Sequence, residues 1–280
     1  MPFLELFDET LDINRTGEYI LTLQSGFDDI SFCILDAIRN KYIMVRSYTP
    51  DENSRYNFED ISGIIAGDDF LSKKYKNINL IMPCSEFTLV PSSLYEPARK
   101  DEYFEFNHGK KENRTILSNK IPDIDSFLLF GVSTPLFDTI RNFFPTPTPF
   151  HHLKPLFTHM THAMKSHKGN YIHLHVENDF FNLTVFTDFS LYYSNAFTYR
   201  NVSDIVYFTL SIFKNLGIGN EETIFVSGLS EKYDNLTSTL SLYIRNIVFA
   251  MPAGNFTFSY VFNETDLHRF INLYTAINCE

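Results

Sequence analysis

The sequence contains no tryptophan and only three cysteines, Cys33, Cys84 and Cys279, which lie far apart. An odd number of widely spaced cysteines is typical of reduced thiols, so we expect no disulfide framework and a cytoplasmic location. No apolar run approaches the roughly 20 residues that a membrane-spanning helix needs. The first ten residues carry three acidic groups and no basic one, which is not the pattern of a secretory signal.

Basic residues are also scarce compared with acidic ones. There are 23 lysines and arginines against 34 aspartates and glutamates, a net charge of -11. Because nucleic-acid-binding surfaces are basic, this balance argues against a nucleic acid as a partner. Hydrophobic residues make up 44% of the chain and charged residues 20%, which is enough apolar material for a large core. The 280 residues correspond to two domains or one large domain.

The first part of the chain predicts three strands, a helix and a fourth strand. The strands cover residues 19–24, 29–35, 41–48 and 78–82. Short turns separate the first three strands, which favours an antiparallel meander. The helix begins after Asn57, a residue suited to the N-cap, and ends at Gly67. The fourth strand is continuously apolar, as strands in the middle of a sheet are.

The same order of elements recurs about 150 residues later. A spacing of this length indicates a duplicated domain rather than an array of short repeats. The strands of this second copy cover residues 171–176, 180–186, 189–199 and 223–226. Its helix has Ser203 as the predicted N-cap and ends at Gly217. Between and after the copies we expect strands over 85–90 and 125–130 and helices over 95–107, 135–144, 153–166 and 264–277. We therefore predict two domains, residues 1–168 and 169–280.

Three antiparallel strands, a helix and a parallel strand are the order of a ribonuclease H-like domain, and two such domains in tandem form the actin-like ATPase fold. The segments Ser31–Asp36 and Phe87–Tyr95, followed by Tyr103–Asn107, resemble those of an uncharacterised bacterial family of unknown function. That family is similar in layout to the actin-like proteins of pilus assembly and type II secretion. The resemblance covers about residues 15 to 280. It implies an α/β fold with mixed five-stranded sheets flanked by helices, but no activity.

In an actin-like ATPase, each half carries a hairpin with a glycine next to phosphate and an aspartate that holds Mg²⁺ through water. In the first hairpin of this sequence the aspartate position falls on Gln24 and the glycine position on Gly26. Gln24 carries no charge for Mg²⁺, which prefers carboxylate oxygens. Asp28 and Asp29 follow, but they lie on the turn rather than at the end of the strand. The first phosphate site is therefore only partly present.

In the second hairpin the same two positions fall on His175 and Glu177. Glu177 places a side chain and a negative charge where phosphate would bind, and like charges repel. On the adenosine side the pair of glycines falls on Gly228 and Leu229, preceded by Ser227. Since Leu229 would crowd the backbone, nucleotide hydrolysis is not expected, and Gly26 and Gly228 are interpreted as turn glycines.

Seven of the nine histidines fall between residues 151 and 175. Two pairs share a face of a predicted element: His159 with His162 on a helix, and His173 with His175 on a strand. Either pair could supply two imidazoles to Zn²⁺, with Glu177 or Asp179 as a third ligand. The alternatives are a set of hydrogen-bonded or solvated histidines at the domain junction and a pH-sensitive hinge.

These observations lead to one main hypothesis and two alternatives. The main hypothesis is a non-catalytic, actin-like protein that binds an unidentified protein partner and needs no cofactor. The first alternative is an ATPase or sensor that binds Mg-ATP through Gln24, Gly26, Asp28, Ser227 and Gly228. The second alternative is a zinc site at the domain junction built from His159, His162, His173 and His175. The identity of the partner and the oligomeric state are left open by the sequence.

Overall fold

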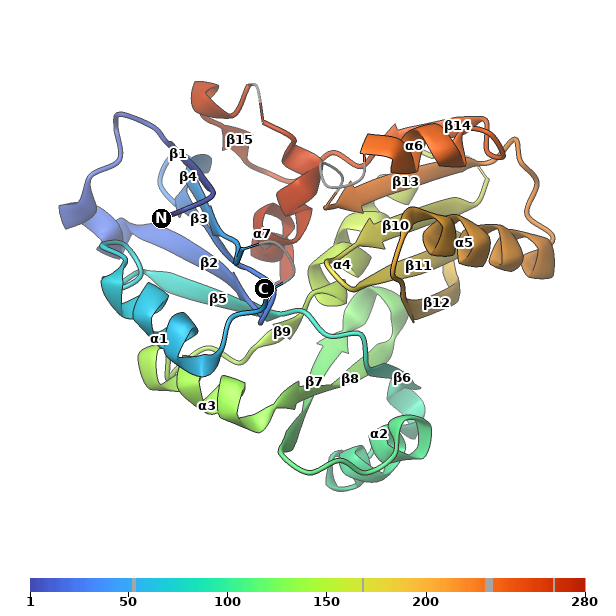
Figure 1. Ribbon diagram of the computed structural model, residues 1–280, viewed down its shortest axis with the longest axis horizontal. Coiled ribbons are helices and arrows are strands. Elements are labelled where there is room, and N and C mark those ends of the chain that lie inside the picture. Colours follow the sequence, from blue (N-terminus) through green and yellow to red (C-terminus); the bar gives the residue numbers. More distant parts are fainter. Residues whose placement is uncertain (52–53, 168, 230–233, 264, 280) are drawn as a thin grey trace. The chain divides into compact units, whose positions relative to one another are not determined.

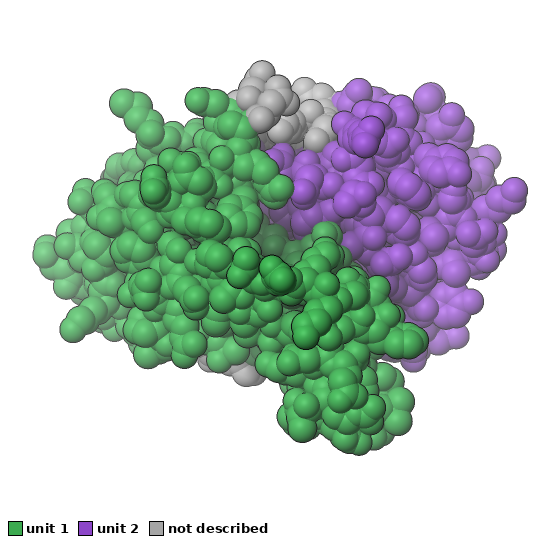
Figure 2. Space-filling view, turned by 60° about the horizontal axis from the view of Figure 1, so that its bottom comes forward, with its two compact units in different colours: residues 1–156, 254–265, 272–280 green, residues 157–253, 266–271 purple. Residues whose placement is uncertain are grey.

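A computed structural model of the chain describes residues 1–51, 54–167, 169–229, 234–263 and 265–279 (Figure 1). The chain forms two compact units, which Figure 2 shows in different colours. Unit 1 comprises Met1–Leu156, Gly254–Thr265 and Asn272–Glu280, and unit 2 comprises Phe157–Ala253 and Asp266–Ile271. The predicted division into 1–168 and 169–280 differs from these units, because two segments near the C-terminus pack with unit 1.

The main sheet of unit 1 has seven strands. They are β1 (Leu4–Phe7), β2 (Tyr19–Ser25), β3 (Ile30–Asp36), β4 (Lys41–Tyr48), β5 (Asn77–Met82), β9 (Phe150–His151) and β15 (Thr257–Phe258). The strand order is β1-β4-β3-β2-β5-β9, and β15 pairs with β4. The antiparallel meander β2-β3-β4 and the parallel neighbour β5 confirm the predicted strands. Every residue of β2 and β3 is buried, so both faces of the sheet are covered at its centre.

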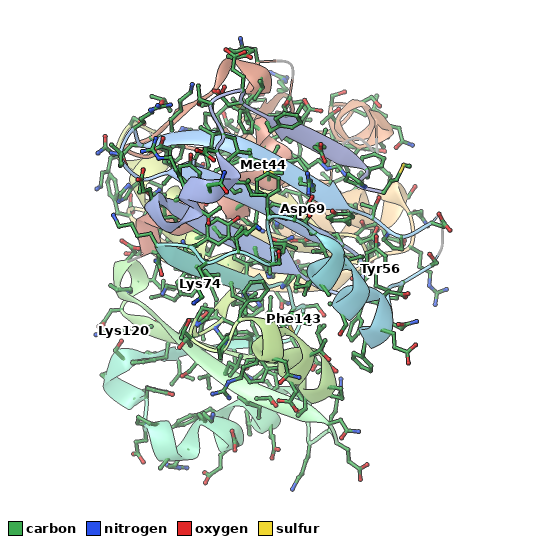
Figure 3. All side chains as sticks on the ribbon, turned by 90° about the vertical axis from the view of Figure 1, so that its left-hand side faces the viewer. Met44, Tyr56, Asp69, Lys74, Lys120 and Phe143 are labelled. Carbon is green, nitrogen blue, oxygen red and sulfur yellow. The ribbon has the colours of Figure 1, made fainter. Side chains whose placement is uncertain are left out.

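Helix α1 (Phe58–Gly67) begins as the sequence predicts. The Asn57 side chain accepts a hydrogen bond from the Asp60 amide, and the Asp60 side chain accepts one from the Asn57 amide. This capping box satisfies backbone groups that the helix itself leaves free. Helix α3 (Thr134–Phe143) packs against α1, and α4 (Leu153–Met164) follows. Figure 3 labels Tyr56 just before α1 and Phe143 at the end of α3.

A small second sheet in unit 1 contains β6 (Phe87–Pro91), β8 (Ser126–Ser133) and β7 (Arg114–Ile121), in that order. Helix α2 (Lys100–His108) contacts all three strands, and its Phe104 is buried among their apolar side chains. Two short 3-10 helices, Ser92–Leu94 and Pro97–Arg99, precede α2. The helix predicted over 95–107 is therefore too long at its start, because Pro97 forces the preceding residue into an extended conformation. Strand β7 was not predicted.

Unit 2 contains a five-stranded sheet. Its strands are β10 (Tyr171–Val176), β11 (Phe180–Thr187), β12 (Ser190–Thr198), β13 (Thr223–Gly228) and β14 (Asn246–Phe249). The order β12-β11-β10-β13-β14 repeats the order β4-β3-β2-β5-β9 of unit 1. The predicted duplication is thus present in the topology. The expectation of five strands holds for this sheet, whereas β1 and β15 extend the sheet of unit 1 to seven.

Helices α5 (Val202–Leu216) and α6 (Asp234–Leu240) belong to unit 2. The predicted N-cap Ser203 is wrong, because Asn201 caps α5 in a capping box with Asp204. Gly217 ends α5 with a positive φ of 68°, which confirms the predicted end, since glycine adopts this conformation without steric cost.

The helix predicted over 264–277 is interrupted. Its residue 264 lies outside the described residues, and the rest forms a 3-10 helix (Leu267–Phe270), α7 (Ile271–Thr275) and another 3-10 helix (Ala276–Cys279). Further 3-10 helices cover Ile13–Glu18, Pro122–Ile124 and Tyr260–Phe262. None of the helices in the described ranges combines the length and the apolar character that crossing a membrane requires.

Candidate functional site

The end of β2 places Gln24 at the centre of the sheet of unit 1. Gln24 pairs with Ser31 of β3 and with Ile81 of β5, and its side chain is buried. Its Oε1 accepts a hydrogen bond of 3.3 Å from Nδ2 of Asn272. An amide at this position can orient a neighbour by hydrogen bonding, but it supplies no charge to a metal ion.

The turn that follows β2 is open at Gly26. The Gly26 amide donates to the Asp29 carbonyl at 3.0 Å, and the Asp29 carboxylate accepts from Ser31 Oγ at 2.8 Å. An added Cβ at Gly26 would meet no atom closer than the Asp28 nitrogen, at 4.0 Å. The Asp28 carboxylate forms an ion pair of 2.6 Å with Arg55. Local packing therefore does not require glycine at position 26, and both carboxylates of the turn have protein partners.

The equivalent strand ends of unit 2 hold a chain of four buried polar side chains. Ser227 of β13 lies next to His175 of β10 in the parallel pair. Ser227 Oγ is 2.7 Å from His173 Nε2 and 2.7 Å from His175 Nδ1. His175 Nε2 lies 3.0 Å from Glu177 Oε1. We call these residues, His173, Ser227, His175 and Glu177, the Ser227 cluster.

One assignment of protons satisfies every contact in the Ser227 cluster. With Glu177 ionised, Nε2–H of His175 donates to its carboxylate, which leaves Nδ1 of His175 as an acceptor. The Ser227 hydroxyl then donates to this nitrogen, and Ser227 Oγ accepts from Nε2–H of His173. Both histidines are neutral in this arrangement. Burial favours the same state, because it lowers the pKa of His175 to about 3 and the pKa of His173 well below its usual value.

Gly228 lies where β13 approaches β10 too closely for any side chain. Its φ is 88°, and an added Cβ would lie 2.0 Å from the carbonyl oxygen of Val176. The amide of Leu229 donates to the same oxygen at 2.9 Å. Gly228 is therefore required by backbone packing. The hairpin beside it is also fixed, because the Tyr199 hydroxyl lies 2.5 Å from the Glu177 carbonyl oxygen.

The predicted site residues fall into two separate groups. Gln24, Gly26 and Asp28 belong to unit 1, and Ser227 and Gly228 belong to unit 2. Sequence analysis did not predict that Ser227 joins His173 to His175. The signal for it is the spacing of His173 and His175, which places both on one face of a strand, next to a parallel strand with a hydroxyl residue near its end.

The four predicted zinc ligands have different surroundings. His162 is exposed, whereas His159 is buried and its pKa is lowered to about 4 by that burial. The rings of His159 and His173 are perpendicular, with centroids 6.4 Å apart. Both ring nitrogens of His175 are within hydrogen-bonding distance of Ser227 and Glu177. Across the described ranges, no group of three or more histidine, cysteine, aspartate or glutamate side chains is arranged to hold a metal ion. The zinc site stays a prediction.

Comparison with known proteins gives a family and a fold. Residues 8–247 match the family described as "Protein of unknown function (DUF3822)". No curated protein matches the chain. A protein of unknown function with an actin-like ATPase fold from Bacteroides thetaiotaomicron is 20% identical, with a TM-score of 0.74 over 94% of this chain and 98% of that chain. The PilM-PilN type IV pilus biogenesis complex contains a chain that is 9% identical, with a TM-score of 0.63 over 93% of this chain and 98% of that chain. These similarities show the actin-like ATPase fold.

Proposed function

The chain belongs to the DUF3822 family of proteins of unknown function, and we propose that it is a non-catalytic member of the actin-like fold that acts by binding a protein partner. The observation that carries this proposal is the Ser227 cluster. Its side chains are linked to one another by hydrogen bonds at the strand ends where the fold would otherwise approach phosphate. A protein can keep its fold after it has lost a catalytic site, so the actin-like architecture by itself does not argue for catalysis.

Phosphoryl transfer needs backbone amides or cations around the phosphate and a carboxylate for Mg²⁺. Unit 1 has the neutral Gln24 at the place of the carboxylate, and the carboxylates of Asp28 and Asp29 are paired with Arg55 and Ser31. Unit 2 has Glu177 at its hairpin, whose charge would repel a phosphate. The described residues of both strand ends therefore argue against nucleotide hydrolysis.

A role in binding a protein is supported by the similarity to a solved complex. The PilM-PilN structure holds a chain of this fold in a complex with a second protein, so the fold is compatible with such an assembly. If this chain has no working phosphate site, its function would be to bind a partner rather than to hydrolyse a nucleotide.

The proposal is tested by calorimetric titration with Mg-ATP and with ADP. We expect no saturable heat and no rise in melting temperature, because a ligand that binds only the folded state would stabilise it. Saturable binding tighter than about 1 mM would overturn the proposal in favour of a nucleotide-binding protein. Gly26→Ala is the matched variant, since the open turn accepts a Cβ without a steric change. Loss of the heat in this variant would place the nucleotide at the turn of unit 1.

A second experiment tests the binding role directly. The tagged chain is used to isolate candidate partners, and each candidate is purified and titrated against the untagged chain. We expect saturable binding whose affinity is the same with and without Mg-ATP. A partner that binds only in the presence of Mg-ATP would contradict a nucleotide-independent module and would favour a nucleotide-dependent sensor.

A further inference from the structure

The last strand of the unit 2 sheet lies in a stretch with exposed apolar side chains and almost no charge. Five large apolar residues are exposed there: Leu242, Tyr243, Val248, Phe249 and Met251. Between residues 235 and 253 the sequence contains a single charged residue, Arg245, and its guanidinium is paired with Glu221 at 2.7 Å. An edge strand with exposed apolar side chains is prone to pair with another molecule.

Among the residues that the structure describes, the main chain of β14 has one paired edge and one open edge. Ala250 N–H donates to the Val226 carbonyl at 2.9 Å, in a parallel ladder that matches Phe249 with Val226. In such a ladder, successive residues direct their N–H and C=O groups to opposite sides. The groups of Val248 therefore face β13, and those of Ile247 and Phe249 face away from it. Within the described residues, β14 pairs only with β13. An open strand edge is a template for another strand.

We infer that the β14 edge pairs with the β14 edge of a second copy of this chain, in an antiparallel dimer with its twofold axis at Val248. In this register Ile247 lies opposite Phe249 of the second copy, and these two residues exchange both of their main-chain hydrogen bonds. The symmetric pair does the same, so the pairing uses the groups that face away from β13. Val248 then lies opposite Val248 of the second copy as a non-hydrogen-bonded pair, where side chains come closest.

Charge favours a second copy as the occupant of this edge. The chain has a net charge of -11, so two copies repel each other wherever carboxylates meet. The stretch from residue 235 to residue 253 contains no carboxylate. In the proposed register Arg245 lies opposite Met251 of the second copy, so the two arginines do not face each other.

The opposite outer strand of the same sheet offers a contrast. The exposed residues of β12 are Ser190, Tyr192, Asn195 and Thr198, of which three are polar. Polar side chains on an edge strand reduce its tendency to pair with another molecule. The two edges of one sheet thus predict different behaviour, and β12 provides the matched control for β14.

The inference is tested by sedimentation velocity, which measures the oligomeric state at protein concentrations that span about 100-fold. We expect a monomer–dimer equilibrium in the wild-type chain. Val248→Lys should weaken it at least about tenfold, because two ammonium groups would meet at the axis, while the fold survives because Val248 is 45% exposed. Tyr192→Lys, at a side chain that is 62% exposed on β12, should leave the equilibrium unchanged. A wild-type chain that stays monomeric, or a dimer that Val248→Lys does not weaken, would overturn the inference.

A cysteine scan tests the register. The Cα atoms of a non-hydrogen-bonded antiparallel pair lie about 4.5 Å apart, which is within the range of a disulfide. Under mild oxidation Val248→Cys should therefore form a covalent dimer that the wild-type chain and its own three cysteines do not form. Phe249→Cys should form much less of it, since its opposite residue is Ile247. A stronger cross-link at position 249 than at position 248 would contradict the register.

Discussion

The strand ends of the two units are built in opposite ways, although their sheets repeat one strand order. In unit 1 the turn at Gly26 is open, and the buried Gln24 makes one contact of 3.3 Å with Asn272. In unit 2 an added Cβ at Gly228 would overlap the carbonyl oxygen of Val176, and Ser227 lies 2.7 Å from both His173 and His175. Position 26 thus accepts a side chain, whereas position 228 does not.

This difference shows that a glycine at a motif position does not by itself indicate a role in ligand binding. Gly26 and Gly228 are both candidates for nucleotide binding from the sequence, yet only Gly228 has a steric reason to be glycine. A role in binding would predict loss of ligand on substitution, and a packing role predicts loss of stability. Each of the following experiments is a test of the contrast between the two strand ends.

The largest effect is expected for Gly228→Ala. Its Cβ would overlap the Val176 carbonyl oxygen at a φ of 88°, so we expect a loss of at least about 3 kcal/mol in the free energy of unfolding. Gly26→Ala should change it by less than about 0.5 kcal/mol. Urea unfolding of both variants measures the difference. Equal effects would show that the two glycines do not differ in their packing.

Ser227→Ala should have the next largest effect. It leaves His173 Nε2 and His175 Nδ1 buried without their shared partner, and each unpaired buried group costs about 1–3 kcal/mol. Gln24→Leu, which removes a single long hydrogen bond in unit 1, should cost about 1 kcal/mol or less. Urea unfolding at pH 7 compares the two variants. A cost for Gln24→Leu as large as that for Ser227→Ala would remove the proposed contrast.

The buried histidines of unit 2 predict a loss of stability in acid. Burial lowers the pKa of His159 to about 4, whereas an unfolded histidine titrates near 6.5. As the pH falls from about 6.5 to 4, the unfolded chain binds the proton and the folded chain does not, so stability falls.

His159→Met removes this contribution. The variant should lose about 2 kcal/mol less than the wild-type chain between pH 7 and pH 5, measured by urea unfolding at both values. His162→Gln, which replaces an exposed histidine of the same helix, is the control and should keep the wild-type difference. An unchanged pH dependence in His159→Met would show that the pKa of His159 is the same in the folded and the unfolded chain.

The smallest effect is expected at the open turn of unit 1. Arg55 and Asp28 form a largely exposed ion pair of 2.6 Å, and such pairs contribute about 0.5 kcal/mol. Arg55→Ala should lower stability by about this amount at low salt and by less at high salt, because salt screens exposed charges. A loss above about 2 kcal/mol would show that the turn is as tightly constrained as the strand end of unit 2.

Local signals predicted much of each unit. Asn57 predicted the start of α1, and Gly217 predicted the end of α5, because caps depend on a few neighbouring residues. The predicted N-cap Ser203 was wrong although the sequence carries the correct signal, since Asn201 and Asp204 have the spacing of a capping box. Strand β14 was missed because four residues carry too weak a pattern.

The sequence by itself determined the two meanders, their parallel partners and the duplication, because strand alternation, turn residues and helix caps act over a few residues. Only the tertiary structure decided which polar residues meet. His175 and Ser227 are 52 residues apart and lie together because β10 pairs with β13. The need for glycine at position 228 likewise comes from the backbone of Val176 on another strand. Contacts between distant strands depend on register and packing, which no local pattern specifies.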